Sequence, residues 1–147
     1  MQPTDALRKA DEIRHALLDL HKSMIDAQRI IYERDHGRVE TPAQFLGLVL
    51  EHPDFEWIRE LSALMALLDE WREDSREVNS VTLEDIVGAL RALIQRDSPN
   101  ARFTDRYWRM LDSTPEVLVG HVKLWRMLGA EALNSRQDGK PDPGAAG

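Results

Sequence analysis

Residues 5–36 of this chain read DALRKADEIRHALLDLHKSMIDAQRIIYERDH, a stretch that contains neither proline nor glycine. Small and apolar residues recur in it at alternating steps of four and three: Ala6, Ala10, Ile13, Leu17, Leu20, Met24, Ala27 and Ile31. This is heptad spacing, and it predicts one continuous helix. At 1.5 Å per residue the helix would be roughly 48 Å long, so the rest of the chain must pack along it.

Glycine, proline and capping residues divide the rest of the chain into further helices. Gly37 follows the first helix, and Thr41-Pro42 and Thr114-Pro115 combine an N-cap residue with proline at the first helical position. We expect helices over residues 42–51, 54–77, 83–94, 102–111 and 115–133. The helix over 42–51 should bury four apolar residues: Phe45, Leu46, Val49 and Leu50.

The sequence therefore predicts an all-α fold. The arrangement should resemble a four-helix bundle of residues 5–36, 54–77, 83–94 and 115–133, with 42–51 and 102–111 as short connecting helices. We expect a single domain over residues 1–134. Residues 135–147 are rich in Gly, Pro, Asp and Ala, and we expect them to be disordered.

Composition limits the function. The chain has 147 residues, no cysteine and a formal net charge of −7, and its Lys and Arg are interleaved with acids. The lack of cysteine excludes disulfides and thiolate chemistry, and the lack of an unopposed basic patch argues against a nucleic-acid partner. No signal-peptide pattern or run of about 20 apolar residues is present, so we expect no membrane partner and a cytoplasmic location.

Polar residues interrupt the apolar surface of the first helix. Its column Arg14, His21, Gln28 lies between the heptad seam and a second apolar row that ends at Tyr32. Such residues should be partly buried and should need partners, because an unpaired buried polar group costs about 1–3 kcal/mol. Nothing else in the sequence indicates catalysis, since no nucleophile elbow and no glycine-rich phosphate loop is present.

Other helices could supply those partners. His121 lies in the apolar seam of the last helix, which also contains Leu118, and Ser62 and Asp69 stand beside the seam of residues 54–77. We therefore expect the four principal helices to enclose a small cluster of histidine, amide and carboxylate groups.

Three interpretations of this cluster remain open. A divalent metal could be bound by His21, Asp69 and His121, although no Glu-x-x-His motif is present. A small ligand could be bound by His21, Gln28, Asp69 and His121 beside Tyr32. The cluster could instead be a hydrogen-bonded layer that fixes helix register or lies in a dimer interface, with no cofactor.

Part of the sequence resembles a known group of proteins. The resemblance lies in residues 20–22, 26–29, 32–34, 36–37, 52–53 and 57–69, which read LHK, DAQR, YER, HG, HP and WIRELSALMALLD. They resemble a group of small uncharacterised bacterial all-helical proteins. The resemblance implies a bacterial cytoplasmic protein and assigns no role to His21 or Gln28.

These observations lead to one principal hypothesis of function and one alternative. The first helix is longer than the short helices that should cover it, so part of its apolar surface could need a second copy of the chain to bury it. We expect a homodimeric interaction or regulatory protein without catalytic activity, with a possible further protein partner. The alternative is a helical bundle that binds a metal ion or a small ligand and is conceivably an enzyme.

Overall fold

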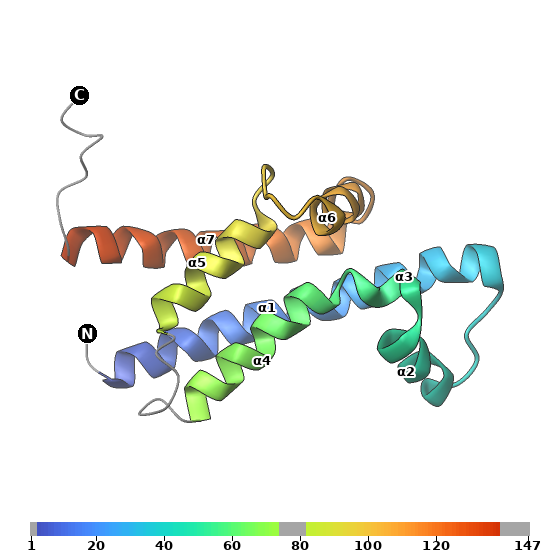
Figure 1. Ribbon diagram of the computed structural model, residues 1–147, viewed down its shortest axis with the longest axis horizontal. Coiled ribbons are helices and arrows are strands. Elements are labelled where there is room, and N and C mark those ends of the chain that lie inside the picture. The colour runs from blue at the N-terminus through green and yellow to red at the C-terminus, as the bar shows by residue number, and fades with distance from the viewer. Residues whose placement is uncertain (1–2, 74–81, 139–147) are drawn as a thin grey trace.

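The computed structural model describes residues 3–73 and 82–138. Every regular element in these ranges is an α-helix, which confirms the all-α class (Figure 1). The helices are α1 (Pro3–His36), α2 (Pro42–Glu51), α3 (Pro53–Glu56), α4 (Arg59–Glu73), α5 (Leu83–Ile94), α6 (Ala101–Ser113) and α7 (Pro115–Asp138). None of the helices in the described ranges is both long and apolar enough to cross a membrane.

Capping residues set several helix ends where the sequence predicts them. Thr41 Oγ1 accepts a hydrogen bond from the backbone amide of Gln44 at 3.1 Å and caps α2. Thr82 and Asp85 form a reciprocal capping box at the start of α5. Gly37 has φ 84° just past the end of α1, a conformation that L side chains rarely adopt.

The predicted helix over residues 54–77 is wrong as a single element, because the chain turns between α3 and α4. The backbone amide of Ile58 donates a hydrogen bond to the carbonyl of Phe55, three residues back. The backbone amide of Leu61 donates to the carbonyl of Ile58 in the same way. Phe55, Trp57 and Ile58 are all buried. In an uninterrupted helix Trp57 would point roughly 200° away from Phe55, so the turn lets both rings enter the core. The predicted residues 74–77 lie outside the described residues.

Two further expectations need correction. Helix α7 continues to Asp138, so residues 135–138 are helical rather than part of a disordered tail; residues 139–147 lie outside the described ranges. Helix α2 has no fully buried residue: Phe45 and Val49 are half-buried against the core, whereas Leu46 and Leu50 are 59% and 61% exposed. The reason is its position: α2 contacts α3 near one end of the molecule, so only one of its faces packs against the core (Figure 1).

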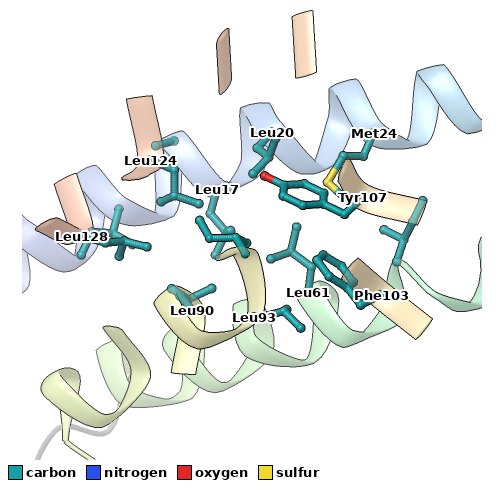
Figure 2. Close-up of a cluster of buried hydrophobic side chains, with 14 of the residues drawn as sticks. Leu17, Leu20, Met24, Leu61, Leu90, Leu93, Phe103, Tyr107, Leu124 and Leu128 are labelled. Carbon is teal, nitrogen blue, oxygen red and sulfur yellow. The ribbon is translucent and has the colours of Figure 1, made fainter. Parts of the chain in front are cut away.

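Four helices surround the core. Helix α1 contacts α4 and α7, and α5 closes the ring by contacting α4 and α7. Helix α6 contacts α5 and α7 and adds two aromatic rings to the core. Figure 2 shows the resulting layer of buried side chains from five helices. Its labelled members are Leu17, Leu20, Met24, Leu61, Leu90, Leu93, Phe103, Tyr107, Leu124 and Leu128.

The contact between α1 and α7 is close because of Gly120. A Cβ atom added at Gly120 would lie 3.3 Å from the Cα atom of Leu20 and 3.3 Å from its Cδ1 atom. A Cβ atom at Gly129, in the same helix, would meet nothing within 4 Å. Gly120 therefore lets the backbones of the two helices approach, whereas Gly129 has no such role.

Alanine substitution at the two glycines should have opposite effects. Gly129→Ala should stabilise the protein by up to about 1 kcal/mol, because alanine is the better helix former. Gly120→Ala should instead destabilise it, because crowding in a packed core costs about 1–3 kcal/mol. Urea unfolding of both variants measures the difference. Equal stabilisation by both substitutions would show that the two helices can separate without cost.

Candidate functional site

The polar column of α1 is paired with α4, one residue at a time. Arg14 Nε donates to Asp69 Oδ1 at 2.6 Å. One heptad further along, His21 Nε2 lies 2.8 Å from Ser62 Oγ. Burial lowers the pKa of His21 from its ordinary value, so the hydrogen bond involves a neutral imidazole near neutral pH. The prediction that this column is partly buried and needs partners is confirmed for both residues.

Gln28 continues the column at its buried end. The side chain is only 6% exposed, and its Oε1 atom accepts a hydrogen bond from Trp57 Nε1 at 3.1 Å. The turn between α3 and α4 brings the Trp57 ring to this position. The carboxamide is therefore held through its oxygen, and its NH₂ group has no acceptor within the described part of the chain.

The expected convergence of His21, Asp69 and His121 is wrong. No three His, Asp or Glu side chains among the described residues lie close enough together to hold a metal ion. The reason lies in α1 itself: residues one heptad apart are separated by roughly 10 Å along the axis. Asp69 pairs with Arg14, whereas His21 pairs with Ser62.

His121 belongs to a different part of the core. Its Nδ1 atom lies 2.6 Å from Tyr107 Oη, and its ring centroid lies 5.2 Å from that of Trp108 and 6.2 Å from that of Trp125. Burial lowers the pKa of His121 and raises that of Tyr107, so the hydrogen bond joins two groups that are neutral near pH 7. The sequence pattern places Tyr107 only among apolar residues of its helix, so it carries no signal of this partnership.

Tyr32 also lies apart from the other candidates. Its ring stacks on His36 with centroids 4.2 Å apart and meets the edge of His52 at 5.0 Å. Phe55 completes this aromatic group at 6.4 Å. Tyr32 therefore packs the end of α1 against α3 and does not face His21 or His121.

A groove opens where α1, α6 and the start of α7 meet. Its volume is about 630 Å³. Four buried residues line its floor: Ala27, Gln28, Trp57 and Met110. Ile30 and Ile31 form part of its edge, and Ile30 is 55% exposed. Of the candidates from the sequence, only Gln28 lines this groove.

Charge is distributed unevenly around the groove. Arg34, Arg106 and Arg109 line it and are exposed, and Glu116 is the one acid among the lining residues. Sequence reasoning missed these arginines because Arg34 lies on α1, whereas Arg106 and Arg109 lie on α6, more than 70 residues later in the chain. Only the meeting of α1 with α6 and the start of α7 brings them to the same opening.

Comparisons with protein-family models, with curated proteins and with solved structures found no match. Any function must therefore be argued from the geometry of the chain itself.

Replacing only one member of the hydrogen-bonded pair Tyr107–His121 should destabilise the protein. Tyr107→Phe leaves a buried imidazole nitrogen without its hydrogen-bond partner and should destabilise the protein by about 1–3 kcal/mol. The double variant Tyr107→Phe/His121→Leu should lose less than the sum of the two single variants, because neither polar group then remains unpaired. Urea unfolding of all three variants gives the coupling energy. Simple additivity would contradict the pairing.

The buried histidines should make stability depend on pH. The folded state lowers the pKa of His21 and His121 below the ordinary value of 6.5. The unfolded state therefore binds more protons than the folded state as the pH falls through 6.5. The free energy of unfolding is therefore at its full value above about pH 6.5 and should decline as the solution is acidified. We expect the loss between about pH 7.5 and about pH 5.5 to shrink in His21→Gln/His121→Gln. His15→Gln, at an exposed position, is the control and should leave the loss unchanged.

Proposed function

We propose that this protein is a non-catalytic interaction protein that acts as a homodimer and that self-associates through α2. The observation that carries the proposal is the exposure of α2, a helix of ten residues none of which is buried. The proposal retains the cytoplasmic location expected from the sequence.

The exposed surface of α2 is strongly apolar. The helix reads PAQFLGLVLE, in which Glu51 is the single charged residue. Leu46 and Leu50 are one turn apart and therefore lie on the same face. A well-exposed row of large apolar side chains is typical of a surface that another protein covers.

A second copy of the chain is the occupant that the charges favour. In a two-fold symmetric interface both chains contribute the same surface, and residues near the axis face their own copies, so charges of one sign there would repel each other. In a chain with a net charge of −7, an uncharged surface avoids this repulsion and therefore favours self-association. The surface formed by Leu46 and Leu50 is uncharged, whereas the groove lined by Arg34, Arg106 and Arg109 is not.

The pairing of the internal polar residues supports a binding role over a catalytic one. Arg14 and His21 each hydrogen-bond a side chain of α4, and His121 is bonded to Tyr107. These groups are engaged in holding helices together, so they are poorly placed to exchange protons with a substrate.

Charged substitution on α2 tests the proposal. Wild-type protein should sediment as a dimer at micromolar concentration, and Leu46→Glu/Leu50→Glu should sediment as a folded monomer, because four carboxylates would face one another. The spacing-matched control is Leu118→Glu/Val122→Glu, which alters two exposed apolar residues of α7. It should remain a dimer. Monomeric wild-type protein, or a dimer broken by the control alone, would overturn the proposal.

A further inference from the structure

We propose that the groove between α1, α6 and the start of α7 binds an organic anion with an apolar body, that is, a carboxylate or phosphate on an aliphatic or aromatic group. This site is separate from the α2 surface, and its occupation does not depend on dimer formation.

The floor of the groove provides a surface for the apolar body. Ala27, Trp57 and Met110 line it although each is buried in the fold, so the hollow reaches inward between α1 and α6. Ile30 and Ile31 extend the apolar surface to the opening. A volume of about 630 Å³ lies in the range of roughly 300–1,000 Å³ that small organic ligands occupy.

The opening of the groove provides the charge. The guanidinium groups of Arg34, Arg106 and Arg109 have no ion pair, hydrogen bond or ring contact within the residues that the structure describes, whereas those of Arg14 and Arg72 each reach a carboxylate. Three unpaired guanidinium groups around one hollow are well suited to a carboxylate or phosphate, which they can bind through paired N–H donors.

Uncharged donors at the groove favour the same ligand. The NH₂ group of the buried Gln28 has no acceptor within the described residues, and Gln28 lines the floor. The groove also includes Pro115 and Glu116, the first residues of α7, where the helix dipole is positive. The backbone amide of Glu116 likewise has no acceptor in the described ranges. Donors thus outnumber acceptors around the hollow.

Glu116 opposes this preference. Its carboxylate is the single negative charge among the lining residues, so the three arginines leave a net charge of +2 at the groove. The chain as a whole carries −7. A local positive charge on an acidic protein therefore distinguishes this hollow from the surrounding surface.

A fluorescent probe of the right chemistry tests the site. Anilinonaphthalene sulfonate combines an aromatic body with one anionic group, and its fluorescence rises when it is bound in an apolar site. The titration uses Leu46→Glu/Leu50→Glu protein, so that the exposed α2 surface cannot take up the probe and the result is independent of the dimer. We expect saturable binding of one probe per chain.

Charge-matched variants then locate the probe. In the same background, Arg106→Gln/Arg109→Gln should weaken binding by about tenfold or more, while Arg38→Gln/Arg126→Gln, which removes two exposed arginines outside the groove, should change it by less than about twofold. Ile30→Glu should also weaken binding by placing a carboxylate at the edge. Glu116→Gln should strengthen it by about threefold.

Competition distinguishes recognition of the anion from simple apolar binding. Octanoate and octyl phosphate should displace the probe at concentrations at least about tenfold below those needed of octanol, which lacks the charge. Equal displacement by octanol, or equal losses in the two arginine variants, would overturn the proposal. The near-ultraviolet circular dichroism of every variant must match the parent, and Ile30→Glu supplies the decisive comparison if the arginine variant does not fold.

Discussion

The close contact between α1 and α7 is the constraint on which the other helices depend. With no side chain on Gly120, the backbone of α7 approaches Leu20 and the two helices share a continuous line of buried residues. Helix α4 occupies another side of α1, and α5 closes the ring between α4 and α7. Helix α6 ends where α7 begins, beside the last turns of α1, so this same packing creates the groove at their junction.

Polar residues on a long helix can be buried without forming a common site. Arg14, His21 and Gln28 recur at heptad spacing, which keeps them on one face and separates them along the axis. Each therefore hydrogen-bonds a different partner, and the three bonds form a ladder along α4 that ends at Trp57. Such a ladder favours one register between the two helices, because sliding one helix past the other would leave every polar group unpaired.

The two exposed features differ in charge and would therefore suit different occupants. Helix α2 is apolar and almost uncharged, which allows it to face a copy of itself. The groove combines an apolar floor with three unpaired arginines, which suits a smaller, negatively charged molecule. Because they belong to different parts of the molecule, one surface can be altered while the other is left intact.

The sequence by itself determined the helices other than α3 and α4, since heptad spacing, Thr41-Pro42 and the box of Thr82 and Asp85 are local signals that act through nearby backbone groups. It also determined that the column containing His21 would need partners. Tertiary structure alone decided which partners those were, why the chain turns at Trp57, and that α2 stays exposed. The physical reason is that burial and pairing depend on which surfaces meet. A local pattern can specify that a face is apolar or polar, but the residue opposite it is fixed only when the helices pack.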